Sequence, residues 1–144
     1  MKRLILLTIV FCLAASTASA GAFGIRGGYT IDPDQFHVGG HFNVGQIFKP
    51  IRLVPNVEIG FGDNYTLWAL NADFIWDISE SAFSLGGEVG LNISSFDSDH
   101  GGGSNSDLGL SILGDYRFNE KLFGEVKLGL ADSPDVKLTV GYNF

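Results

Sequence analysis

The side chains best equipped for chemistry in this 144-residue chain are charged or basic groups that fall at alternating positions of well-separated segments. Five of them are carboxylates, three are cations and one is an imidazole. The set comprises Arg26, His41, Glu58, Asp73, Glu88, Asp115, Arg117, Glu125 and Lys127. Alternate residues of a β-strand share one face, so we expect these groups to meet on one side of a sheet.

Two kinds of chemistry fit this set. Buried charges must be paired, which favours a structural network of salt bridges and hydrogen bonds in which five carboxylates face Arg26, Lys127 and, as a further candidate, Arg117. The surplus of carboxylates leaves an acid-base site or a proton path as the alternative, with His37 and His41 available to take up protons.

The sequence argues against an enzyme. Nucleophilic catalysis by serine needs a histidine held by a carboxylate. His37 and His41 fall on the same face as the carboxylates, while His100 lies in a glycine-rich loop, and the chain has no G-x-S-x-G motif. We therefore predict no catalytic residue and no cofactor.

The acidic stretch from Asp97 to Asp107 is the weak candidate for a metal site. Asp97 and Asp99 are spaced as in a calcium loop, and Asp107 follows, but Leu108 stands where such a loop has its bidentate glutamate. A flexible acidic loop is the preferred interpretation, with bound Mg²⁺ or Ca²⁺ as the alternative.

Composition narrows the class of protein. Charged residues make up 17% of the chain, glycine occurs 20 times, and the formal net charge of -7 disfavours nucleic-acid binding. At the start, Lys2 and Arg3 precede an apolar run that ends at Ala18-Ser19-Ala20, as in a secretory signal peptide cleaved after Ala20. The expected domains are a signal peptide at 1–20 and one domain at 21–144.

The remaining chain shows period-two alternation of apolar and polar residues in eight segments, which predicts an all-β fold. Pro55 cannot donate to a strand ladder, so the third strand is expected to begin near Asn56 or to carry a bulge. The segments are Phe23 to Thr30, Phe36 to Val44, Asn56 to Phe61, Trp68 to Asp77, Phe83 to Ile93, Leu108 to Phe118, Leu122 to Ala131 and Val136 to Phe144.

Alternation alone does not say which face lies inside, because a soluble lipocalin-like barrel would bury the apolar face. The polar face here is rich in glycine and poor in lysine and glutamate, which suits the narrow interior of an eight-stranded barrel. Aromatic residues also gather near the strand ends, like girdles at two membrane interfaces. We predict an eight-stranded antiparallel up-and-down transmembrane β-barrel with a polar lumen, its outer connections including 95–107 and its periplasmic ones including 45–52.

The last segment carries a resemblance. Val140, Tyr142 and Phe144 alternate up to the final residue, which looks like the C-terminal assembly signal of bacterial outer-membrane proteins. The chain resembles the porin-like family of small eight-stranded outer-membrane barrels typified by OmpX and the transmembrane part of OmpA. This resemblance implies an integral outer-membrane location, contact with lipid and lipopolysaccharide, and assembly by the barrel-insertion machinery and periplasmic chaperones.

The expected function is that of a small monomeric outer-membrane barrel with a closed, side-chain-filled lumen and a structural or envelope-supporting role. One alternative is a barrel that binds or transports a small apolar ligand or an ion. A second alternative is an outer-membrane enzyme that modifies lipid A.

Overall fold

The computed structural model describes residues 23–63, 65–96 and 101–144. The predicted signal peptide at 1–20 lies outside the described residues. Among the residues that are described, no helix is long and apolar enough to cross a membrane.

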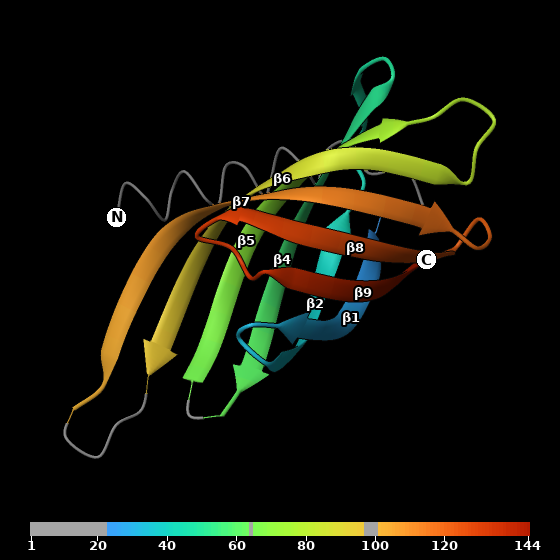
Figure 1. Ribbon diagram of the computed structural model, residues 1–144. Helices are drawn as coiled ribbons and strands as arrows, with labels where there is room; N and C mark the ends of the chain where they lie inside the picture. The colour runs from blue at the N-terminus through green and yellow to red at the C-terminus, as the bar shows by residue number, and fades with distance from the viewer. Residues whose placement is uncertain (1–22, 64, 97–100) are drawn as a thin grey trace.

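The described chain forms nine β-strands (Figure 1). The strands are β1 (Phe23–Ile31), β2 (Gln35–Phe42), β3 (Gly45–Phe48), β4 (Ile51–Gly62), β5 (Tyr65–Asp77), β6 (Phe83–Phe96), β7 (Gly103–Arg117), β8 (Leu122–Ala131) and β9 (Val136–Asn143). Eight of them close into an antiparallel barrel, because β1 pairs with β9 and β2 pairs with β4. The short β3 follows β2 and pairs with the start of β4. The predicted eight-stranded antiparallel barrel is confirmed.

The two ends of the barrel differ in the connections that they carry. The terminal end carries Phe23 and Phe144, where the Phe144 amide donates to the Phe23 carbonyl at 2.9 Å, together with the β5–β6 and β7–β8 turns. The loop end carries the β1–β2, β4–β5, β6–β7 and β8–β9 connections. Because β6 and β7 pair from Phe83 with Tyr116 to Phe96 with Gly103, their hairpin is the longest of the barrel.

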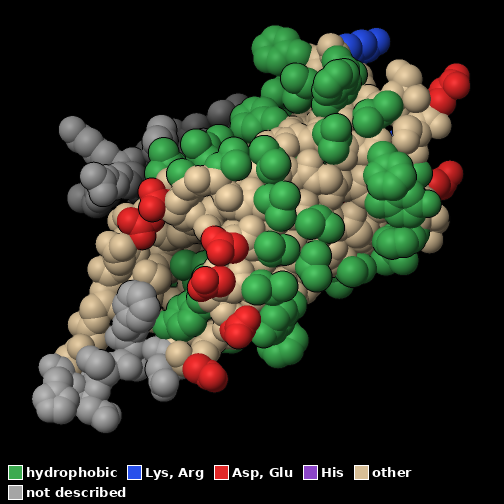
Figure 2. Space-filling model, in the orientation of Figure 1, with side chains coloured by type: hydrophobic (Ala, Val, Ile, Leu, Met, Phe, Trp, Pro, Cys, Tyr) green, Lys and Arg blue, Asp and Glu red, His purple; other side chains and the backbone are tan. Residues whose placement is uncertain are grey.

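The strands form as they do because each one alternates between a polar inward face and an apolar outward face. In β9, Lys137 and Thr139 are buried, whereas Leu138, Val140 and Tyr142 are exposed on the wall. Hydrophobic side chains cover much of the visible wall in Figure 2. The predicted assignment of the two faces is confirmed.

Two predicted boundaries are wrong. The strand that contains Pro55 begins at Ile51 and carries no bulge against β5, where Pro55 pairs with Ala72. Pro55 is tolerated because the ladder between β2 and β4 ends at the His41–Asn56 pair, so Pro55, the neighbour of Asn56, has no partner on β2 to which it would have to donate. The expected loop from Ser95 to Asp107 is also shorter than predicted, since both flanking strands extend into it.

Candidate functional site

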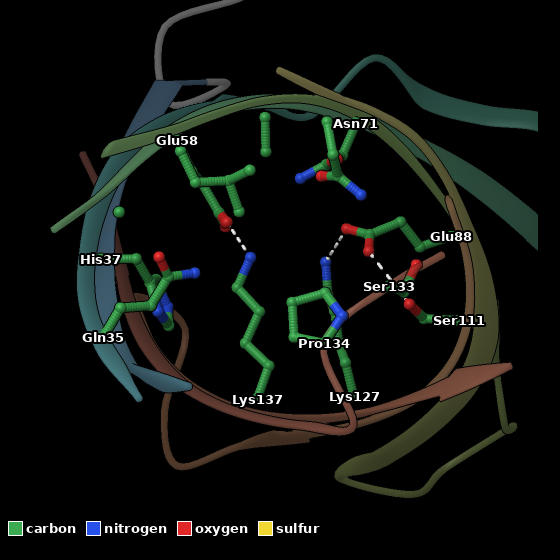
Figure 3. Close-up of a pocket in the computed structure, with 14 residues that line it drawn as sticks. Gln35, His37, Glu58, Asn71, Glu88, Ser111, Lys127, Ser133, Pro134 and Lys137 are labelled. Atoms are coloured by element: carbon green, nitrogen blue, oxygen red, sulfur yellow. Dashed lines mark hydrogen bonds and ion pairs between the residues drawn. The ribbon is translucent and has the colours of Figure 1, made fainter. Parts of the chain in front are cut away.

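The interior of the barrel, here called the lumen, is filled by side chains from all around the wall (Figure 3). Among the described residues, 17 buried side chains are polar or charged and only six are hydrophobic. Every second residue of each strand points inward, and these inward positions carry the polar and charged side chains. The lumen is therefore the place to look for a functional site.

A central ionic cluster occupies the middle of the lumen. The Lys127 ammonium from β8 binds Asp73 of β5 at 2.9 Å and Glu125 of its own strand at 3.3 Å, and it also pairs with Glu88 of β6. The Lys127 side chain is 2% exposed, so its three carboxylate partners take the place of water.

Arg26 of β1 is the second cation of the central cluster. Its Nη1 atom lies 3.2 Å from Asp73, 3.4 Å from Glu125 and 3.6 Å from Glu58. The guanidinium also lies 5.7 Å from the centre of the Phe123 ring, within the range of a cation–π contact. Asp73 and Glu125 are thus shared by both cations, which joins β1, β5 and β8 across the lumen.

Neutral polar side chains extend this cluster. Asn71 donates to Asn56 at 3.0 Å, and Asn56 donates to Asp73 at 3.0 Å. His37 lies between two hydroxyls, with its Nδ1 3.2 Å from Thr30 Oγ1 and its Nε2 3.0 Å from Thr139 Oγ1. These contacts satisfy groups that would otherwise be costly to bury.

Toward the loop end, Lys137 of β9 pairs with Glu58 of β4, next to a small cavity (Figure 3). The cavity measures about 20 Å³ and is also lined by Lys127, Ser133 and Pro134. A volume of about 10 to 15 Å³ holds one water molecule, so this space accommodates a water and no larger ligand.

The β8–β9 connection folds over this cavity and contributes Ser133 and Pro134 to its lining. Pro134 lies inside the ring of strands in Figure 3. Asn92 of β6 donates to the Asp132 carbonyl at 3.0 Å, and the Asp135 amide donates to the Asp32 carbonyl at 3.2 Å. The connection is therefore held from two sides of the barrel mouth.

The terminal end of the lumen holds a different arrangement of side chains. Arg52 of β4 binds Asp77 at 3.0 Å and lies 3.7 Å from Asp115. On the terminal side of the central cluster, three buried apolar side chains pack together, namely Val54, Ile75 and Leu113. An ionic layer and an apolar layer thus occupy this end.

The structure brings most of the sequence-predicted lumen residues together, with two differences. Asp115 pairs with Arg52 at the terminal end instead of with the central cations. The expectation that Arg117 joins the network is wrong, because its side chain is exposed and Nη2 donates to the Ser81 carbonyl at 3.2 Å. It stands at the end of β7, beyond the closed part of the lumen. His41 lies in the lumen, with Nε2 2.8 Å from Asn143.

Sequence reasoning missed Lys137 and Arg52 as lumen cations. Lys137 has the same parity as Thr139, so its inward direction could have been read from β9. Arg52 was assigned to a turn, and only the early start of β4 places it inside. With these two residues included, the surplus of carboxylates is smaller than the sequence suggested.

The other predicted positions lie elsewhere. Asp97 and Asp99 fall outside the described residues, and Asp107 lies in β7, where Asn105 donates to it at 2.7 Å. No three histidine, cysteine or acidic side chains converge as a metal site within the ranges that the structure describes. The residues of the predicted assembly signal, Val140, Tyr142 and Phe144, are all exposed on the outer face of the barrel.

Comparison with solved structures gives several barrels of the same fold. The N-terminal β-barrel domain of Pseudomonas aeruginosa OprF matches with a TM-score of 0.61 and 17% identity, covering 88% of this chain and all of that one. Ail, the attachment invasion locus protein of Yersinia pestis, crystallised with the heparin analogue sucrose octasulfate, matches with a TM-score of 0.56 and 17% identity, again covering 88% of this chain and all of that one. Neisserial surface protein A matches with a TM-score of 0.51 and 14% identity over the same fractions of the two chains.

No protein-family model matches the sequence, and no curated protein matches it. The likeness to solved structures, at 17% identity or less, shows the fold: a small eight-stranded barrel of the kind found in outer-membrane proteins.

Proposed function

We propose that this protein is an integral outer-membrane barrel with a closed lumen and a structural, envelope-supporting role. The observation that carries the proposal is that polar side chains are buried while large hydrophobic ones are exposed. Among the described residues, 30 large hydrophobic side chains are exposed, while the buried residues are mostly polar. A water-soluble barrel has the opposite arrangement, because apolar area is removed from water when it folds.

The height of the apolar wall supports a membrane location. In β9 the outward apolar residues run from Val136 to Phe144, and in β1 from Phe23 to Ile31, nine residues each. Tilted transmembrane strands of about 9 to 11 residues cross a bilayer. Both chain ends of such barrels lie in the periplasm, so the terminal end faces the periplasm and the loop end faces outward.

The packed lumen supports a structural role over transport. Ion pairs at three levels and the β8–β9 connection leave room for about one water molecule. This packing of the described residues favours a lumen that is closed to ions and solutes.

The charge of the loop end bears on its surroundings. Asp32, Asp34, Asp63, Asp132 and Asp135 lie there, and no lysine or arginine occurs in its connections. A sulfated ligand such as the one bound by Ail would be repelled by this surface. Contact with lipopolysaccharide phosphates would need divalent cations as bridges.

Cell fractionation and gel mobility test the proposal. The full chain, expressed in a Gram-negative host, should be recovered from the outer membrane and should migrate differently before and after heating. Recovery as a soluble periplasmic protein that stays folded without detergent would contradict a membrane barrel.

A further inference from the structure

The outward wall of the barrel is not evenly convex. A groove of about 920 Å³ runs across the outer faces of β2, β1, β9, β8, β7 and β6. This volume falls within the range of about 300 to 1,000 Å³ that is typical of ligand sites. The outward side chains along it are apolar or aromatic, apart from glycines.

Strand register explains the groove. One row of cross-strand partners runs from Val38 through Gly27, Val140 and Gly124 to Tyr116. The adjacent row runs from Phe36 through Tyr29, Leu138 and Val126 to Gly114. Three glycines therefore interrupt two neighbouring rows of large side chains. The wall is open at Gly114, where an added Cβ atom would have no neighbour within 4 Å, whereas the Phe118 ring lies 3.1 Å from the Cβ position of Gly124.

Aromatic pairs border the groove at both sides. Tyr29 and Phe36 form an edge-to-face pair with ring centres 5.0 Å apart. On the other side, Tyr116 packs against Phe83 at 4.8 Å and against Phe118 at 5.0 Å. These packed rings give the groove fixed sides.

Two exposed cations stand at the terminal end of the strands that line this groove. Arg117 follows Tyr116 directly in β7. Lys121 lies in the β7–β8 turn, with its ammonium 5.7 Å from the centre of the Tyr142 ring. Because the terminal end faces the periplasm in the proposed orientation, these cations lie at the height of the lipid headgroups of that leaflet.

We propose that the groove binds one anionic glycerophospholipid of the periplasmic leaflet. An acyl chain lies along Gly27 and Gly114, beside the Phe118 ring that covers Gly124, and the phosphate binds Arg117 and Lys121. The apolar floor suits the chain, and the two cations complement the charge of the headgroup. This inference rests on the proposed membrane location.

Gly114 offers a clean test of the acyl-chain contact. A Cβ atom at Gly114 has no neighbour within 4 Å, so Gly114→Phe can fill the groove without a backbone collision. The matched control is Gly40→Phe, an outward glycine of β2 outside the groove, where an added Cβ meets only the Gly24 carbonyl oxygen at 3.7 Å.

The measurement is native mass spectrometry of the full chain in detergent, titrated with dioleoyl phosphatidylglycerol or dioleoyl phosphatidylcholine. We expect the unmodified protein and Gly40→Phe to retain one phosphatidylglycerol. Gly114→Phe should bind it roughly tenfold more weakly, since excluding two methylenes from an apolar contact already has that effect. Equal binding by the two phenylalanine variants would overturn the inference.

The headgroup contact has its own control. The double variant Arg117→Gln/Lys121→Gln should lose the preference for phosphatidylglycerol over phosphatidylcholine, while Lys49→Gln, an exposed cation at the β3–β4 turn, should keep it. A preference that survives in the double variant would overturn the assigned headgroup site. A protein dimer that disappears in Gly114→Phe would make a second copy the occupant and overturn the lipid.

Each variant is first checked for heat-dependent gel mobility. If a phenylalanine variant does not fold, Gly114→Leu and Gly40→Leu replace the pair. Folded barrels that need detergent but bind no lipid at the groove would leave the proposed function standing and reject this inference. A chain that is soluble without detergent would reject the proposed function itself.

Discussion

Lys127 and Lys137 are direct cross-strand partners on β8 and β9, yet both ammonium groups are buried. Each one reaches across the lumen to a carboxylate on the opposite wall, Lys127 to Asp73 and Lys137 to Glu58. Asp73 and Glu88 likewise face each other across the β5–β6 ladder. Like charges placed directly opposite destabilise a sheet, so these neighbours depend on the ion pairs that cross the barrel.

Removal of Lys127 should therefore be costly. Lys127→Met leaves Asp73, Glu88 and Glu125 without their shared cation, and breaking a buried pair in this way costs about 3 to 5 kcal/mol. Reversible urea unfolding in lipid vesicles measures the loss. The exposed Lys49→Met should stay within about 0.5 kcal/mol of the unmodified protein. Similar free energies of unfolding for both variants would show that the central cluster contributes little.

Gly90 and Gly87 of β6 provide a test of the two faces. A Cβ atom at Gly90 would collide with Asn71 Oδ1 in the lumen, whereas at Gly87 it would have an ordinary contact of 3.6 Å with the Ser111 carbonyl oxygen. Gly90→Ser should displace Asn71 from its bond to Asn56 and cost about 1 to 3 kcal/mol. Gly87→Ser should cost less. The same unfolding assay compares them, and a larger loss for Gly87→Ser would reverse the faces of β6.

Val89 tests the lipid-facing wall. It lies in the middle of β6 and points outward, so Val89→Arg should destabilise by roughly 2 to 4 kcal/mol, as for arginine at the midplane of such barrels. Leu130 lies one residue from the end of β8, where Leu130→Arg should cost only about 0 to 1 kcal/mol. If both arginines are tolerated equally, the wall is not embedded in a bilayer.

The strand faces could be predicted from the sequence because the period of two is local and determines which residues share a face, while the residue types of the two faces indicate which one points inward. Lys137 illustrates this, since its parity already places it inside. The partners of each charge could not be predicted in the same way. They depend on register and barrel closure, which place Lys127 of β8 against Asp73 of β5 although 54 positions separate them.

Exceptions to the pattern were also beyond sequence reasoning. Arg52 lies in the lumen because β4 begins at Ile51, four residues before Pro55. Pro55 is compatible with this early start because the ladder between β2 and β4 ends at Asn56, so Pro55 needs no amide hydrogen for a partner on β2. Leu113 and Ile75 are apolar residues on the polar face, and they pack with Val54 to fill the terminal end. The cost of substituting Gly90 likewise depends on Asn71, a neighbour from another strand.

Phe144 connects the structure to assembly. Its exposed ring pairs with Tyr142 at 5.7 Å, and its amide bonds to Phe23 where β1 and β9 meet. Deletion of Phe144 removes the terminal aromatic of the predicted assembly signal and one hydrogen bond beside the closing seam. The amount of folded barrel in the outer membrane should fall sharply, as measured by heat-dependent gel mobility of membrane fractions. Unchanged levels would count against the assembly signal.

Ion conductance tests the closed lumen most directly. The full chain is reconstituted into a planar lipid bilayer, and insertion is verified by recovery of the folded, heat-modifiable form. With ion pairs at three levels and a cavity of about 20 Å³, we expect no current above that of the bare bilayer. Stable, voltage-independent channel openings by the unmodified protein would contradict it.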